Sequence, residues 1–127
     1  MISSKYISDI LDLLLDGDDL GTSARSQIDY LADERYEYTG VGAFVSFKQL
    51  PGIEKHRLTT DRVILNGLEI ESTLLEIGAE ASVFIDGGLI EYLEIWSYSG
   101  EYPSRELTDY TLKQSWTNGE GREIVVK

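Results

Sequence analysis

The stretch 78–103 constrains the fold of this chain more than any other part of the sequence. It contains two apolar segments, 79–85 and 89–98, on either side of a turn that begins with Asp86-Gly87. Two β-type segments joined by a short glycine-containing turn are typical of a β-hairpin. We therefore predict an antiparallel hairpin here, and with it a fold that has a β-sheet at its centre.

The second strand of this hairpin, 89–98, has apolar residues on both of its faces. A strand of this kind is typical of the middle of a sheet that is covered on both sides. Leu93 and Ile95 are predicted to lie in the core. Glu91 and Glu94 fall on opposite faces in this alternation, so we do not expect them to act as a pair.

The N-terminal part of the chain is predicted to be helical. Apolar residues recur at helical spacing in residues 4–15, and Ser3 or Ser4 can cap the start of this helix. Gly17 can adopt the left-handed conformation that ends it. The last turn and the residues after it are acidic and contain no Lys or Arg, although a helix C-terminus prefers cations.

A second helix is expected to follow after a short connection. It would run from Thr22 or Ser23 to about Arg35, because apolar residues in this stretch again recur at helical spacing. A short connection between two helices favours an antiparallel helical hairpin.

The next segment, 38–48, is rich in β-branched and aromatic residues and is predicted to be a strand. Gly40 and Gly42 near its start indicate a bulge or a close approach of another backbone. Residues 61–72 are predicted to form a further strand or strand pair, in which Asn66-Gly67 is either a hairpin turn or a bulge.

The C-terminal part is expected to add one strand at 109–116 and a short edge strand at 124–126. The residues between them, 116–121, are predicted to form a loop.

Helices followed by strands predict an α+β fold, with two N-terminal helices packed on a mostly antiparallel β-sheet. A length of 127 residues favours a single domain, 1–127. The sequence has no cysteine, so a disulfide framework is excluded. The N-terminal apolar run is too short to span a bilayer and aspartates interrupt it, so a cytoplasmic location is expected and no membrane partner.

Acidic residues dominate the charge of the chain, which has 23 Asp and Glu against 11 Lys and Arg and a net charge of −12. Ten of the acidic residues fall in residues 69–109, where Arg105 is the only base. A field of this sign repels nucleic acids and attracts basic proteins. We therefore expect no nucleic-acid partner, although acidity of this kind also serves solubility alone.

Motifs for catalysis and cofactor binding are absent from the sequence. His56 is the only histidine, and there is no G-x-S-x-G motif around which a hydrolase site could form. Residues 16–27 match a calcium loop in part, but Leu20 stands where an oxygen ligand is required and Gln27 replaces the bidentate Glu at the last position. The sequence therefore predicts no cofactor, no metal site and no enzymatic activity, with a small-molecule enzyme as the weakest alternative.

Residues 76–103 carry a series of short motifs: Glu76-Ile77-Gly78, the apolar strand 81–85, Asp86-Gly87, Leu93-Glu94, Ser97-Tyr98 and Tyr102-Pro103. This series, with a looser match at 38–47, resembles small bacterial proteins that are similar to the immunity proteins of toxin–immunity systems. The resemblance implies an inhibitor that binds a basic bacterial toxin. The same motifs also serve architecture, since they consist of turn glycines, core leucines and a proline at a strand end.

The functional hypothesis is therefore an acidic, non-enzymatic protein-binding module with a basic protein partner. Charge complementarity accelerates association, and a few aromatic anchors supply affinity. A structural or regulatory domain that self-associates is the alternative, and the tyrosines concerned could instead pack at the edge of the core. The candidate partner-binding residues are Tyr98, Glu101, Tyr102, Glu106, Asp109 and Tyr110.

Overall fold

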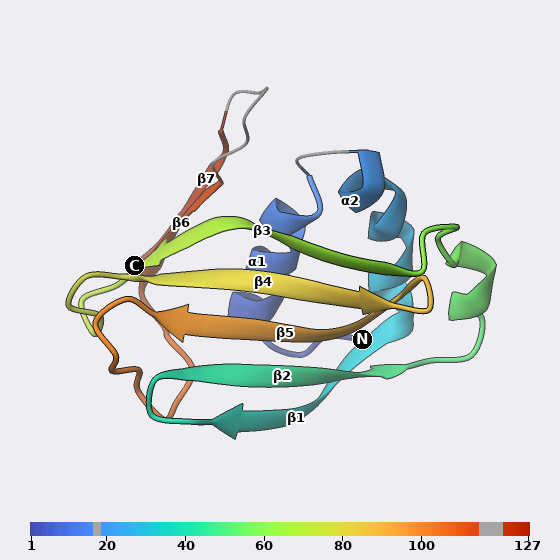
Figure 1. The fold of residues 1–127 in the computed structure, drawn as a ribbon. Helices are drawn as coiled ribbons and strands as arrows, with labels where there is room; N and C mark the ends of the chain where they lie inside the picture. Colours follow the sequence, from blue (N-terminus) through green and yellow to red (C-terminus); the bar gives the residue numbers. More distant parts are fainter. Residues whose placement is uncertain (17–18, 115–120) are drawn as a thin grey trace.

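A computed structural model of the chain describes residues 1–16, 19–114 and 121–127. It contains one seven-stranded antiparallel sheet with the strand order β1-β2-β5-β4-β3-β6-β7 and helices on one of its faces (Figure 1). The predicted α+β class and the antiparallel sheet are therefore confirmed. The elements are α1 (Lys5–Leu14), α2 (Asp19–Ala24), the 3₁₀ helices η1 (Arg25–Tyr30) and η2 (Ile53–His56), and the strands β1 (Leu31–Tyr38), β2 (Gly42–Gln49), β3 (Arg62–Glu71), β4 (Ala79–Asp86), β5 (Leu89–Ser97), β6 (Tyr110–Gln114) and β7 (Glu123–Val126).

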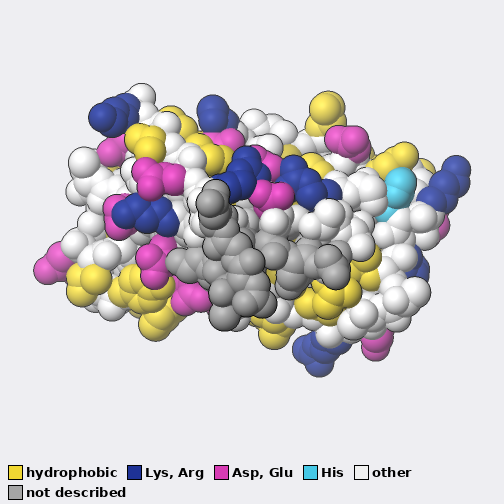
Figure 2. Space-filling view, turned by 90° about the horizontal axis from the view of Figure 1, so that it is seen from above, with side chains coloured by type: hydrophobic (Ala, Val, Ile, Leu, Met, Phe, Trp, Pro, Cys, Tyr) yellow, Lys and Arg dark blue, Asp and Glu magenta, His cyan; other side chains and the backbone are white. Residues whose placement is uncertain are grey.

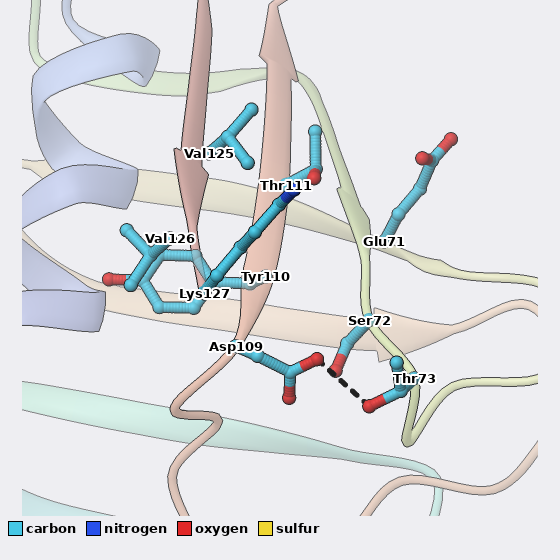
Figure 3. Close-up of a pocket in the computed structure, with 9 residues that line it drawn as sticks. All are labelled: Glu71, Ser72, Thr73, Asp109, Tyr110, Thr111, Val125, Val126 and Lys127. Atoms are coloured by element: carbon cyan, nitrogen blue, oxygen red, sulfur yellow. Dashed lines mark hydrogen bonds between the residues drawn. The ribbon is translucent and has the colours of Figure 1, made fainter.

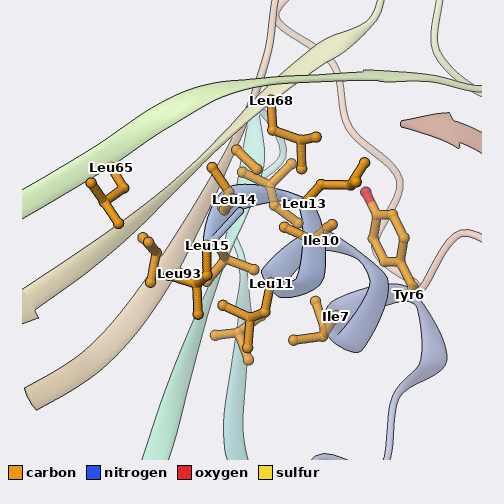
Figure 4. Packing of buried hydrophobic residues seen from close by; sticks show 14 of the residues in the cluster. Tyr6, Ile7, Ile10, Leu11, Leu13, Leu14, Leu15, Leu65, Leu68 and Leu93 are labelled. Atoms are coloured by element: carbon orange, nitrogen blue, oxygen red, sulfur yellow. The ribbon is translucent and has the colours of Figure 1, made fainter. Parts of the chain in front are cut away.

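Helix α1 forms where the sequence predicts it. The Ser4 side chain caps its start by accepting a hydrogen bond from the backbone N–H of Ile7 at 3.1 Å. One face of the helix packs on β3, β4 and β6, and its apolar side chains point at sheet residues such as Leu68 and Leu93 (Figure 4). The expected end at Gly17 lies outside the described residues. Among the described residues, no helix has the length and apolar character needed to cross a bilayer.

The prediction of a second helix that continues to Arg35 is wrong beyond Ala24. Helix α2 covers only six residues, η1 follows it, and β1 begins at Leu31. The predicted helical hairpin is thus replaced by a short helical connection into the first strand. Residues 31–38 have only weak intrinsic preferences for helix and for strand. Pairing with β2 along most of their length therefore decides in favour of the strand.

Residues 38–48 form parts of two strands instead of one. Tyr38 ends β1, β2 starts at Gly42, and the connection between them contains Gly40 with a positive φ of 88°. The close approach expected at Gly42 is confirmed, because a Cβ atom there would lie 1.9 Å from the carbonyl oxygen of Ile95.

Strand β3 is continuous through Asn66-Gly67, and its register with β4 shifts between Leu65 and Leu68. Of the two alternatives for this dipeptide, the bulge is therefore correct. The β4–β5 hairpin and the edge strand β7 are confirmed. The expected strand at 109–116 is β6, and the loop predicted at 116–121 lies mostly outside the described residues.

Strand β5 is covered on one face only. Leu93 and Ile95 are buried as predicted, but Trp96 on the other face is 51% exposed and Tyr92 and Glu94 are half-buried. The prediction that both faces of this strand are covered is therefore wrong. The register of β5 with β4 shifts between residues 84 and 85, and this shift turns Ile90 toward the core. Strict alternation would place Ile90 on the other face, so both faces of the strand seem apolar in the sequence.

Candidate functional site

Two of the three candidate tyrosines lie in the interior. Tyr102 is 5% exposed and its hydroxyl lies 2.9 Å from that of Tyr6, which also belongs to the core. Tyr110 is 4% exposed and donates a hydrogen bond of 2.8 Å to Asp9. Burial raises the pKa of Tyr102 to about 12. As placed, Tyr102 and Tyr110 are core residues and do not offer a surface for a partner, which corrects the sequence-based expectation for these two.

The candidate carboxylates separate into bonded and free groups. Glu106 accepts a hydrogen bond from the Ser4 side chain, and Asp109 accepts one of 2.8 Å from Thr73. Both therefore hold segments of the chain together. Glu101 is exposed and lines a shallow hollow with Leu74.

Asp109 and Tyr110 also line an open groove of about 590 Å³ between the end of β3 and the β6–β7 pair (Figure 3). In this groove the ring of Tyr110 points toward α1, and Asp109 turns toward Thr73. Val125 adds an apolar wall. Two of the polar side chains that line the groove, Thr73 and Asp109, are bonded to each other.

A different surface gathers most of the exposed apolar side chains. Among the described residues, nine large hydrophobic side chains are exposed, and five of them belong to loops and strand ends at one end of the sheet. We call this surface the apolar end patch. Its members are Val41, Leu74, Ile77, Trp96 and Tyr98. Figure 2 shows hydrophobic, acidic and basic side chains next to one another at the left end of the molecule, which in Figure 1 is the end that carries the β3–β4 loop.

Backbone hydrogen bonds fix the three segments that carry the apolar end patch. The N–H of Ser97 donates to the carbonyl of Val41 at 2.9 Å, and the N–H of Tyr98 donates to Gly78 at 3.0 Å. Tyr102 donates in the same way to Gly40 at 2.9 Å. Gly78 has a φ of 120°, and a Cβ atom there would lie 2.9 Å from the carbonyl of Ile70. The patch is therefore held in place before any partner binds, which lowers the entropic cost of binding.

Two carboxylates lie beside Trp96 and Tyr98 in the apolar end patch, and Arg105 lines the hollow next to Leu74 and Glu101. Glu80 on β4 is the register partner of Trp96 on β5, and Glu69 on β3 is the register partner of Glu80. Register partners share a face, so these three side chains project on the open side of the sheet. Burial raises the pKa of Tyr98, and the carboxylates of Glu80 and Glu69 raise it further. The Tyr98 phenol therefore lies close to both carboxylates.

Of the six candidate residues, only Tyr98 and Glu101 lie at this surface. The sequence interpretation missed Val41, Leu74, Ile77 and Trp96. Ile77 is part of the resemblance motif, but nothing in the sequence marked it as exposed. Trp96 was assigned to a covered face, because an alternating pattern does not show on which side of a strand the helices pack.

The opposite end of the sheet carries the only histidine. The ring of His56 lies against that of Tyr30, with 5.0 Å between ring centroids. Within the described ranges, no three side chains of the His, Asp or Glu type are grouped so as to hold a metal ion. Comparison of this chain with protein-family models, with curated proteins and with solved structures gives no match.

Proposed function

We propose that this chain is a non-enzymatic protein-binding module that docks a basic protein on the apolar end patch, in the manner of an immunity-type inhibitor of a bacterial toxin. The observation that carries the proposal is the collection of five exposed apolar side chains at one end of the sheet, with the carboxylates of Glu69 and Glu80 beside Trp96. Contiguous exposed apolar surface with a polar rim is typical of interaction sites, whereas single exposed hydrophobic residues are ordinary.

The composition of the apolar end patch suits a protein partner. Trp96 and Tyr98 are exposed aromatic residues of the kind that dominate binding energy at interfaces. Their rings pack edge to face, with 5.5 Å between centroids and an interplanar angle of 89°. Two rings that hold each other in place lose little side-chain entropy when a partner covers them.

Charge favours a basic partner over a second copy of the chain. In a two-fold dimer the same surface meets itself. The carboxylates beside the apolar end patch, Glu69, Glu76, Glu80 and Glu101, would then meet the same set of carboxylates on the other copy. Like charges brought together in this way cost free energy, whereas a basic surface would neutralise them. An inhibitor of a basic protein is therefore favoured over the self-associating alternative.

The proposal is tested by searching the genes next to the one that encodes this chain for a basic toxin and expressing the product, and the lack of such a gene would count against the proposal. Co-expression should protect cells from that protein, and the two should form a complex in solution. Trp96→Ala should weaken the complex by roughly 30-fold or more, as expected for a central aromatic anchor. The matched control is Ile64→Ala, because Ile64 is 52% exposed but lies on β3 outside the patch.

Equal affinity of the Trp96→Ala and Ile64→Ala variants would place the interface elsewhere and contradict the proposal. So would a concentration-dependent dimer of the free chain, measured by sedimentation, that Trp96→Ala abolishes. That second result would support the self-associating alternative.

A further inference from the structure

The acidic side of the apolar end patch has a defined geometry around Trp96. On β4, Glu80 lies directly opposite Trp96, and on the far side of Glu80 lies Glu69 of β3. On β2, the residue opposite Trp96 is Gly42, which has no side chain. The indole is therefore flanked by carboxylates on one side and by open backbone on the other. Tyr98 meets it at 89° and completes a corner of two perpendicular rings.

Glu69 and Glu80 face each other as like charges on neighbouring strands, which is unfavourable for the sheet. Lys113 is the register partner of Glu69 on β6, but its ammonium group pairs with Glu71 at 3.3 Å. Among the described residues, no ion pair joins Glu69 or Glu80 to a basic side chain of this chain. Within the described part of the chain, neither carboxylate of this corner therefore has a salt bridge.

We propose that the corner formed by Trp96, Tyr98, Glu69 and Glu80 receives an arginine side chain of the docking partner. A guanidinium group is flat and stacks on an indole face, while its N–H donors reach carboxylates in a fixed fork. Lysine presents a strongly hydrated point charge and gains less from stacking. The inference rests on the proposed function, because it assigns one contact within the apolar end patch.

The first experiment needs no partner protein. The sequence has two tryptophans, so Trp116→Phe leaves Trp96 as the only indole reporter. Acetyl-arginine amide is titrated against this variant, and the indole N–H resonance of Trp96 is followed by NMR. The control ligand is acetyl-citrulline amide, which has nearly the same shape without the charge.

Arginine amide should shift the Trp96 resonance saturably, with a dissociation constant in roughly the millimolar range that corresponds to one stacked, charge-assisted contact. Citrulline amide should give no saturable shift, and lysine amide a clearly weaker one. Glu69→Gln combined with Glu80→Gln should abolish saturation. Glu91→Gln, an exposed carboxylate at the other end of β5 and outside the corner, should leave it intact.

An equal response to citrulline amide or to lysine amide would overturn the assignment to arginine, as would an unsaturable shift or saturation that survives in the double variant. The same variants separate this inference from the proposed function. If the partner loses affinity with Trp96→Ala and keeps it with Glu69→Gln and Glu80→Gln, the docking surface stands and the arginine subsite fails. If the affinity of the partner is unchanged by Trp96→Ala while arginine amide binds this chain as expected, the proposed function fails instead.

Discussion

At the scale of single residues, Gln27 joins three segments that are far apart in the chain. It is fully buried, and its amide nitrogen donates to the carbonyls of His56 and Gly88 at 2.9 Å each. Its amide oxygen accepts from the N–H of Ile90 at 2.8 Å. One side chain therefore connects η1, η2 and the β4–β5 turn, and it satisfies polar groups that water cannot reach.

We expect Gln27→Leu to lower the free energy of unfolding by about 2–4 kcal/mol, because the carbonyl of His56 and the N–H of Ile90 would lose their buried partner. Urea denaturation measures this loss. Ser26→Ala, a change at the exposed neighbouring position, is the control and should have little effect. A change below about 1 kcal/mol for Gln27→Leu would mean that these groups find other partners.

Asp33 ties the N-terminus to β1. Its carboxylate accepts from the backbone N–H of Ser3 at 2.8 Å and from the Tyr36 hydroxyl at 2.6 Å. Burial acts to raise the pKa of Asp33, but these hydrogen bonds outweigh it and lower the pKa to about 2. A pKa below the ordinary value means that the ionised form stabilises the folded state above about pH 4.

This stabilisation should be lost as the pH falls through about 4 toward 2, because the carboxylate must then take up a proton that the folded state disfavours. Asp33→Asn should therefore be less stable than the wild type at pH 7, and the difference should shrink as the pH falls. Urea denaturation at several pH values measures it. Glu34→Gln, at the exposed next position, controls for the general effect of removing a charge. A difference that stays constant with pH would contradict the role of Asp33.

At the scale of elements, α1 obtains the cations that its C-terminus lacks from distant parts of the chain. Arg25 pairs with Asp12 at 2.7 Å, and Arg122 pairs with Asp16 at 2.6 Å. Arg25 also donates to the backbone carbonyl of Asp12 at 2.8 Å. The acidic helix end that conflicts with the dipole preference in the sequence is therefore compensated by two arginines in the fold.

The β3–β4 pair differs from this helix end, since in the described ranges Glu69 and Glu80 form no ion pair with a basic side chain. We expect Glu80→Gln to raise the free energy of unfolding by about 0.2–1 kcal/mol, because it removes a like-charge pair across two strands. Thermal denaturation at low salt, where screening is weakest, gives the clearest reading. Glu71→Gln should show no such gain, because Glu71 has Lys113 as its ion-pair partner. Destabilisation by Glu80→Gln would show that this carboxylate supports the sheet.

At the scale of the whole molecule, the net charge of −12 creates a field that a basic partner meets before any contact forms. The association rate with such a partner should fall steeply with salt, since exposed charges are screened beyond about 10 Å at 0.1 M. The positions of the acidic residues should affect the association rate as well as the net charge. Glu76 and Glu101 belong to segments that carry the apolar end patch, whereas Glu34 and Glu123 lie in the edge strands β1 and β7.

We expect reversal of Glu76 and Glu101 to lysine to slow association more than reversal of Glu34 and Glu123, although both double variants change the net charge equally. Stopped-flow association at two salt concentrations measures the rates. Both variants should keep the wild-type melting temperature within a few degrees, because exposed charges contribute little to folding. Equal slowing by the two double variants would mean that only the total charge acts.

Local signals in the sequence were enough for several elements. The period of apolar residues and the cap at Ser4 predict α1, and the Asp86-Gly87 turn predicts the β4–β5 hairpin, because these features act over a few residues. The same kind of signal is wrong beyond Ala24, where helical spacing and strand pairing compete and a distant partner decides. The bulge at Asn66-Gly67 stays one of two alternatives until the register of β3 with β4 is known.

The sequence by itself determined the fold class, the acidic field and the places where the chain turns, because composition, periodicity and turn chemistry are local properties. The tertiary structure decided which face of each strand is covered, since the helices pack on one side of the sheet only. That choice buries Tyr102 and Tyr110 and leaves Trp96 exposed. It also brings Val41, Leu74 and Ile77 to the same end of the sheet, because three separate segments meet there through backbone hydrogen bonds that no local pattern encodes.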